Sequence, residues 1–128
     1  MPAIPIFNNQ GSTTNGSAIT ANGNFCAIIA DSPSSRTLST GQNSGYMINN
    51  ATYLFTTAGA TTGNVAIQAL GADGTWRSLQ TPAVIALSAT LNYSGQILGT
   101  FHGLRLNVSS LAVSTITYAE LTCTISAP

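Results

Sequence analysis

The residues that could do acid–base or metal chemistry are few and lie far apart in the sequence. His102 is the only histidine, and the acids are Asp31, Asp73 and Glu120. A hydrolytic triad needs a histidine held by a carboxylate beside a nucleophile. Glycoside cleavage needs a pair of carboxylates, and calcium is usually bound by clustered acids. The sequence indicates none of these arrangements, so we expect no catalytic residue and no enzyme activity.

The two cysteines do not indicate a metal site. Cys26 and Cys123 lie in apolar, strand-like stretches near opposite ends of the chain. With one distant histidine they do not supply the four ligands of a zinc site. We interpret them as buried thiols that pack as small hydrophobic residues, with a disulfide as the alternative. Residues 71–74 (GADG) are no phosphate loop because no helix is expected after them. We therefore predict no metal and no cofactor.

Charge is scarce in this chain. Charged residues make up 5% of it, against about 25% in a typical domain. There is no lysine, and the arginines Arg36, Arg77 and Arg105 balance the three acids. Three dispersed arginines cannot neutralise a run of phosphates, so nucleic acid is not an expected partner. In one interpretation the surface is hydrated through hydroxyl and amide groups. In the other it lies against other subunits, because interface cores are depleted of charge. We favour the second interpretation.

Targeting signals are not visible in the sequence. No apolar run approaches the ~20 residues needed to span a bilayer. The start, MPAIPIFNN, has neither a basic region nor a long apolar region of the kind found in secretory signals. We therefore expect no membrane partner and synthesis in a cytoplasm.

The stretch expected to organise the fold is residues 64–79, NVAIQALGADGTWRSL. Its first half alternates with a period of two, which is typical of a strand with one buried face. Asp73 and Gly74 are residues that tight hairpin turns favour. The return strand carries Trp76, the only tryptophan. A side chain this large rarely lies in a small β domain without anchoring its core.

Period-two patterns and turn residues continue along most of the chain, and no stretch has helical periodicity. Residues 46–57 are expected to form either one long strand or two strands joined by a bulge at Asn49 and Asn50. Strands in residues 90–93 and 96–98 are expected to flank a turn at Ser94 and Gly95. The fold class predicted is all-β, an antiparallel sandwich and a jelly roll of about eight strands. Further strands are expected in residues 17–20, 25–30, 36–40, 46–57, 84–88, 104–108 and 113–125. The expected core anchors besides Trp76 are Tyr53, Phe55, Leu104, Leu106, Val108 and Leu121.

The first 16 residues differ from the rest, and we expect them to form an extended N-terminal arm, with the sandwich domain in residues 17–128. Two prolines among the first five residues remove backbone donors and favour extended conformations. The apolar residues Ile4, Ile6 and Phe7 belong either to a disordered terminus or to an arm that docks on a neighbouring subunit. Both alternatives remain open at this point.

Two arginines are further candidates for a subunit interface. Arg77 and Arg105 each lie on the polar face of a predicted strand. Each is either a solvated residue whose aliphatic stem covers apolar surface or part of a contact between subunits, where arginine is the charge most often kept. The candidate interface residues are therefore Ile4, Ile6, Phe7, Arg77 and Arg105.

Two segments carry a resemblance to a known group of proteins. They are residues 63–79 (GNVAIQALGADGTWRSL) and 99–109 (GTFHGLRLNVS), followed by a long Thr-rich closing strand. Together they resemble small β-sandwich proteins of tailed-bacteriophage virions, in which a strand, a D-G-x-W hairpin and a later G-x-R-x-x-V-S strand recur in this order. The resemblance covers about the second half of the chain, and the first half carries no recognised motif.

Within that group, a short, lysine-free chain is most similar to a capsid decoration, or cement, protein. The resemblance implies a jelly-roll homotrimer on the capsid surface of the virion. It would bind the lattice of the major capsid protein and stabilise the shell without catalysis, by mass action. Deletion of residues 1–8 is expected to lower shell occupancy and to leave the fold intact.

An alternative is a phage tail or head-fibre module that binds a receptor or a glycan. The aromatic residues Trp76, Tyr46, Tyr53 or Tyr93 would then form a stacking platform. This alternative predicts at least two aromatic side chains exposed together on one surface.

Overall fold

The computed structural model describes residues 3–6, 16, 18–29, 47–58, 61–71, 73–88, 92–112 and 115–126. Within these residues the chain forms nine β-strands and no helix. The strands are β1 (Ala3–Ile6), β2 (Gly23–Ile29), β3 (Met47–Thr57), β4 (Thr62–Leu70), β5 (Trp76–Ser78), β6 (Ile85–Leu87), β7 (Asn92–Ile97), β8 (Gly103–Ala112) and β9 (Ile116–Ser126). The all-β prediction is confirmed.

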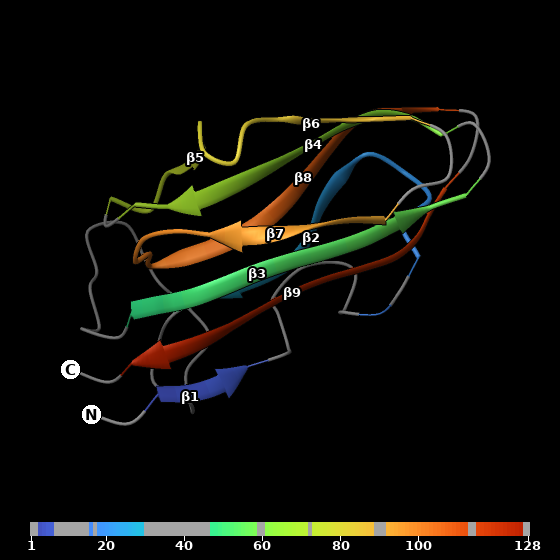
Figure 1. Cartoon of the computed structure of the whole chain (residues 1–128). Helices are drawn as coiled ribbons and strands as arrows, with labels where there is room; N and C mark the ends of the chain where they lie inside the picture. Colours follow the sequence, from blue (N-terminus) through green and yellow to red (C-terminus); the bar gives the residue numbers. More distant parts are fainter. Residues whose placement is uncertain are drawn as a thin grey trace.

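The strands form two antiparallel sheets that pack against each other (Figure 1). Sheet one has the order β1-β9-β3-β7. Sheet two has the order β2-β8-β4-β5, and β6 also pairs with β4. Because β5 pairs with the end of β4 and β6 with its start, these short strands lie along one edge of β4. The predicted antiparallel sandwich is therefore confirmed.

The strand pairings are nested along the chain. β1 pairs with β9, β2 with β8, β3 with β7, and β4 with β5 and β6. The chain is thus one long antiparallel ribbon, and the predicted hairpin in residues 64–79 is its innermost part. The ribbon folds over so that β9 also pairs with β3 and β8 with β4. These additional pairings join the ribbon into two sheets.

The core lies between the sheets and holds most of the predicted anchors. Phe55 is fully buried and stacks between Tyr53 and Tyr93, with ring centroids 5.8 and 5.0 Å away. Tyr53 itself is half-buried and packs against the core cluster. Each fully buried large apolar side chain contributes roughly 1.5–3 kcal/mol relative to an exposed one. The buried anchors are Phe55, Leu104, Leu106, Val108 and Leu121.

Trp76 is not a core anchor, and this prediction is wrong. Val65 and Ile67 of β4 face the core. Side chains alternate along a strand, so Leu70, which is an odd number of residues away from both, faces the outside of sheet two. Trp76 pairs with Leu70 and is half-buried on the outer face of sheet two. With three residues, β5 is too short for its alternation to indicate which side faces the core.

Residues 3–6 belong to the sandwich rather than to a separate arm. β1 pairs with β9 from Ala3 opposite Ser126 to Ile6 opposite Cys123. Pro5 is compatible with this position because an edge strand has one unpaired side. Ile4 and Ile6 therefore lie in the edge strand, and the boundary predicted at residue 16 stays a prediction. Phe7 and the strand predicted in residues 36–40 lie outside the described residues.

The short strand predicted in residues 17–20 is reduced to a single bridge in the described residues. Ile19 pairs there with Ile116 of β9, and the backbone N–H of Ile19 donates to the Ile116 carbonyl. Ile19 is nonetheless buried in the core.

The turn predicted at Ser94 and Gly95 is also corrected, because β7 runs straight through both residues. Gly95 pairs with Tyr53, and a Cβ atom at this position would lie 2.8 Å from the Tyr53 hydroxyl oxygen. The glycine therefore makes room for an aromatic side chain on the neighbouring strand. A pattern of turn-forming residues does not reveal this role.

The run of apolar residues in β2, within the strand predicted in residues 25–30, is buried. Phe25 to Ile28 are all buried, and the register with β8 shifts between them. Cys26 has a φ angle of 56°, and its thiol lies 3.8 Å from the Ala119 carbonyl oxygen of sheet one, to which it donates a weak hydrogen bond. The bulge thus turns an additional residue of β2 toward the core.

Candidate functional site

The titratable side chains with chemical potential are dispersed in the structure. Asp73 lies in the turn between β4 and β5, whereas Glu120 lies in β9 of sheet one. Among the described residues, no group of three His, Cys, Asp or Glu side chains is placed to hold a metal ion. Asp31 and Arg36 lie outside the described residues. The remaining candidates for a site are surfaces and pockets.

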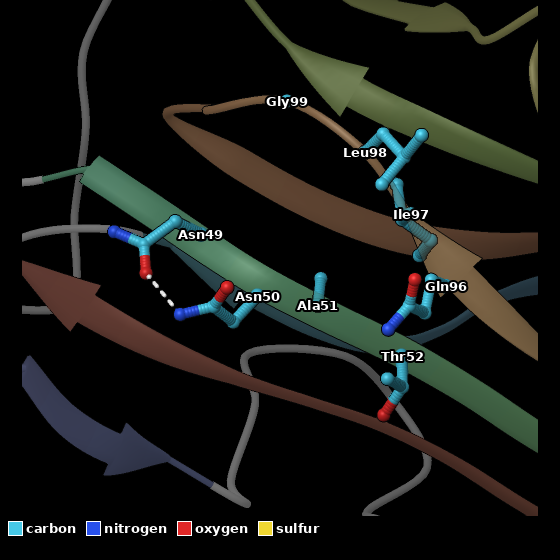
Figure 2. Close-up of a pocket in the computed structure, with 8 residues that line it drawn as sticks. All are labelled: Asn49, Asn50, Ala51, Thr52, Gln96, Ile97, Leu98 and Gly99. Carbon is cyan, nitrogen blue, oxygen red and sulfur yellow. Dashed lines mark hydrogen bonds between the residues drawn. The ribbon is translucent and has the colours of Figure 1, made fainter.

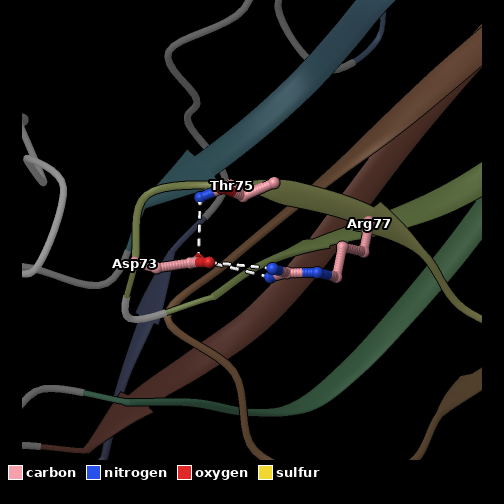
Figure 3. A network of polar contacts seen from close by, with 3 residues as sticks. All are labelled: Asp73, Thr75 and Arg77. Atoms are coloured by element: carbon pink, nitrogen blue, oxygen red, sulfur yellow. Dashed lines mark hydrogen bonds and ion pairs between the residues drawn. The ribbon is translucent and has the colours of Figure 1, made fainter.

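Asp73 organises the turn of the central hairpin (Figure 3). Its carboxylate accepts hydrogen bonds from the Thr75 backbone N–H at 3.0 Å and from the Arg77 guanidinium at 2.8 and 3.2 Å. The hydrogen bond from Arg77, followed by that from Thr75, holds the pKa of Asp73 well below its usual range. Arg77 and Asp73 therefore neutralise each other at an exposed turn, which is a structural role.

The outer face of sheet one carries mainly hydroxyl and amide groups. On it the Thr52 and Thr122 hydroxyls lie 2.7 Å apart, and the Thr56 hydroxyl donates to the Asn92 amide oxygen at 2.6 Å. Glu120, the one charged side chain of this face within the described strands, accepts a hydrogen bond from Tyr118. Three cross-strand rows make up the face: Gln96–Thr52–Thr122, Ser94–Leu54–Glu120 and Asn92–Thr56–Tyr118.

A pocket of about 200 Å³ lies at one end of this region (Figure 2). β3 contributes Asn49, Asn50 and Thr52, β7 contributes Gln96, and Leu98 follows directly after β7. No charged side chain lines the pocket. Amide side chains both donate and accept hydrogen bonds, so the pocket fits an uncharged ligand with hydroxyl or amide groups.

A bulge in β3 brings two of the pocket amides together. Asn50 has a φ angle of 52°, and the register with β9 shifts between Asn49 and Thr52. β3 is thus one long strand that carries a bulge at these asparagines. The Asn50 amide donates to the Asn49 side-chain oxygen at 3.1 Å. The Thr124 hydroxyl donates to the Asn49 carbonyl oxygen at 3.2 Å. The bulge thereby changes the direction of consecutive side chains, as bulges beside binding sites often do.

The outer face of sheet two carries a cation–aromatic pair. The Arg105 guanidinium carbon lies 4.3 Å from the centroid of the Trp76 ring. The Arg105 Nε–H donates to the Gln68 side-chain oxygen at 2.8 Å. Burial lowers the pKa of Arg105 from its ordinary value, and such a pair contributes about 0.5–1 kcal/mol at an exposed site. The planar guanidinium of Arg105 therefore covers the apolar ring of Trp76. The role of Arg105 in a subunit interface stays a prediction.

A second pocket, of about 300 Å³, holds His102. Leu70, Leu79 and Phe101 line it, and Arg77 also contributes. Because Arg77 is paired with Asp73, the pocket does not combine a free cation with the histidine. It has no second catalytic group beside His102 within the described residues that line it.

The exposed aromatic side chains of the described residues do not form one platform. Tyr118 is 39% exposed on sheet one, whereas the half-buried Trp76 lies on sheet two. Tyr53 and Tyr93 pack against the core with Phe55. Tyr46 lies outside the described residues.

The sequence predicted neither the contact between Trp76 and Arg105 nor the pocket beside Asn49 and Asn50. Trp76 and Arg105 are distant in sequence, and their contact depends on β4 lying between β5 and β8. The adjacent asparagines at 49 and 50 indicated a bulge but not a pocket, because Gln96 and Leu98 come from another strand.

Comparisons with known proteins add no relative. No family model, no curated protein and no solved structure matches this chain. Within the described residues there is also no helix with the length and apolar character that crossing a membrane requires.

Proposed function

We propose that this chain is a structural subunit of a tailed-bacteriophage virion that binds the capsid lattice and stabilises it without catalysis. The observation that carries the proposal is a pair of broad sheet faces with almost no free charge. On sheet one the described strands contribute Glu120 alone, on the outer face of sheet two they contribute Arg105 alone, and at the central turn Asp73 neutralises Arg77. Surfaces of this kind are suited to contact with other subunits, because interface cores are depleted of charge.

The placement of the two resembling segments supports the same role. Residues 63–79 form β4 and β5, and residues 99–109 include most of β8. These strands are neighbours in sheet two. The segments that resemble virion proteins therefore make one continuous structural unit.

We also infer that the sandwich is a jelly roll. A jelly roll has two sheets and two Greek keys of antiparallel strands. The nested pairs of this chain lie alternately in the two sheets: β1–β9 in one, β2–β8 in two, β3–β7 in one, and β4 with β5 and β6 in two. An antiparallel ribbon that is rolled into two facing sheets, as in a jelly roll, places its successive strand pairs alternately in the two sheets. The resemblance adds the expectation of a homotrimer that sits on the lattice of the major capsid protein.

Deletion of the gene from the phage that encodes it tests this role. We expect particles to assemble, to lack one density on the outside of the shell in electron micrographs, and to release DNA at lower temperature than wild type. Complementation with the wild-type gene is the control and should restore both properties. Unchanged shells with normal heat resistance would contradict a decoration role.

A receptor- or glycan-binding module is the second candidate, and the neutral pocket lined by Asn49, Asn50 and Gln96 favours it. In that case the deletion should leave the shell unchanged and reduce adsorption to host cells. The double variant Asn50→Ala with Gln96→Ala should reproduce the adsorption defect. Normal adsorption of the double variant would exclude this pocket as the receptor site.

A further inference from the structure

The edges of the two sheets differ in how they are protected against pairing with another strand. An edge strand presents unpaired N–H and C=O groups, and proteins block such edges with short strands, prolines, charges or bulges. β1 has four residues and contains Pro5. β5 and β6 have three residues each, and β5 contains Arg77. β2 is interrupted by the bulge at Cys26.

β7 has none of these protective features. Its six residues, NYSGQI, include no proline and no charge. It pairs with β3 in an unbroken register from Asn92 opposite Thr56 to Ile97 opposite Ala51. Among the described residues β3 is its only neighbour in the sheet. Within the part of the chain that the structure describes, β7 is therefore a regular strand with one unpaired side.

Leu98, directly after β7, is a second indication of a contact at this edge. Its side chain is 73% exposed, the largest value among the exposed large hydrophobic residues of the described chain. Figure 2 shows it beside Ile97, at the end of the strand. A contact that covers it would remove apolar surface from water, which is favourable by about 25 cal/mol per Å².

We propose that β7 of a second copy of this chain pairs antiparallel with β7, so that sheet one continues across a two-fold axis between two subunits. A two-fold contact places the same surface of both copies together, so a charge close to the axis would meet an identical charge. β7 and its outer-face neighbours Thr52 and Thr56 carry no charge, which meets this condition. Strand addition of this kind derives its affinity from main-chain hydrogen bonds.

The sheet geometry restricts the register of this pairing. Tyr93, Gly95 and Ile97 face the core side of β7, because Phe55 and Ala51, the partners of Tyr93 and Ile97, are core residues. Residues directly opposite each other in an antiparallel pair point to the same side, and a one-residue slip exchanges the faces. We therefore expect core-side residues of one copy to lie opposite core-side residues of the other.

Two lysines on β7 test the proposal. The wild-type protein should have an even multiple of the chain mass in light scattering after size exclusion: twice that mass for the two-fold contact alone, or six times that mass if the expected trimer also forms. The double variant Ser94→Lys with Gln96→Lys brings like charges together across the contact, and we expect the dissociation constant to rise about tenfold or more. The matched control is Leu54→Lys with Thr52→Lys, which changes the cross-strand partners of these residues on β3. It adds the same charge to the same face, away from the edge, and should remain dimeric.

A further variant keeps the test valid if the lysines in β7 disturb folding. Leu98→Asp changes an exposed residue outside the strand, so it should keep the far-ultraviolet spectrum and still weaken the dimer. A monomeric wild type, or a dimer that none of these β7 variants weakens, would overturn the proposal. Equal dissociation of the β3 control would place the contact on the sheet face instead. A trimer insensitive to the β7 variants would also overturn it, and would leave the decoration role standing.

Discussion

Trp76 and Phe55 show how differently two aromatic side chains are used in this protein. Phe55 is fully buried between two tyrosine rings, whereas Trp76 lies on the outside of sheet two beneath the Arg105 guanidinium. Residue size alone therefore does not indicate which of them holds the core together. The position of each residue on its strand does.

Alanine substitutions should separate these two roles. Phe55→Ala leaves a cavity between the sheets and should lower the free energy of unfolding by about 3–5 kcal/mol. Trp76→Ala loses partial burial and one cation–aromatic contact, so a loss of about 1–2 kcal/mol is expected. Urea unfolding followed by far-ultraviolet circular dichroism measures both. A larger loss for Trp76 than for Phe55 would contradict the assigned positions.

The two cysteines are free thiols in the buried core. Burial raises the pKa of Cys26 to about 11, and the charge of Glu120 adds to this effect. Burial also raises the pKa of Cys123 to about 11. Since the thiolate is the reactive form, neither should react with a thiol reagent such as DTNB at pH 8 in the native protein. Both should react in urea, and fast reaction without denaturant would contradict their burial.

Asp73 makes stability depend on pH in the acid range. Its pKa is lowered in the folded state, so its contribution is fully present above the unfolded value of about 4 and is lost as the pH falls below it. Asp73→Asn should melt at slightly lower temperature than wild type at pH 7, with a smaller difference at pH 2.5. Arg77→Gln removes the partner and should behave similarly. A difference that grows toward low pH would contradict the ion-pair assignment.

At the scale of the elements, β1 covers the edge of β9. Its four residues pair with residues 123–126, and both ends of the described chain therefore meet in sheet one. Without β1, the longer strand β9 would present an open edge, and open edges promote association. The first residues of the chain thus have a role in the fold as well as any role in binding a partner.

Deletion of residues 1–8 consequently has an additional expected effect. The truncated protein should melt at lower temperature than the full chain and should form larger species at high concentration. Differential scanning calorimetry and light scattering measure the two effects. Pro5→Ala is the control, since it keeps the strand and should change neither property strongly. An unchanged melting temperature after truncation would show that β1 adds no stability.

At the scale of the whole molecule, the strand pairs are nested, so each outer pair encloses the segment of chain that forms the pairs inside it. The outermost pair joins β1 to β9, and the innermost joins β4 to β5. Pairings between distant residues form slowly because the loop between them must first be closed. Among the described strands, β5 pairs only with its neighbour in the sequence, β4, whereas β4 itself also pairs with the distant strand β8.

Folding should therefore be cooperative and slow for a chain of this size. Unfolding measured by Trp76 fluorescence, which reports on sheet two, and by far-ultraviolet circular dichroism, which reports on both sheets, should coincide in urea. Refolding after dilution should take milliseconds to seconds. Two separate transitions would show that the sheets unfold independently.

The sequence by itself determined the local properties of this protein. Alternation with a period of two indicated strands at β3, β4 and β8, and Asp73 with Gly74 indicated the turn of the central hairpin. The shortage of charge indicated neutral surfaces. These features could be predicted because each depends on neighbouring residues and on composition.

Only the tertiary structure decided which strands meet and which way they face. The pairing of β1 with β9, the outward position of Trp76 over Arg105, and the use of Gly95 as space for Tyr53 each depend on a partner far along the chain. The pocket between Asn50 and Gln96 arises in the same way. Local periodicity is the same for every register and every order of strands, so these contacts are set by the packing of the whole domain.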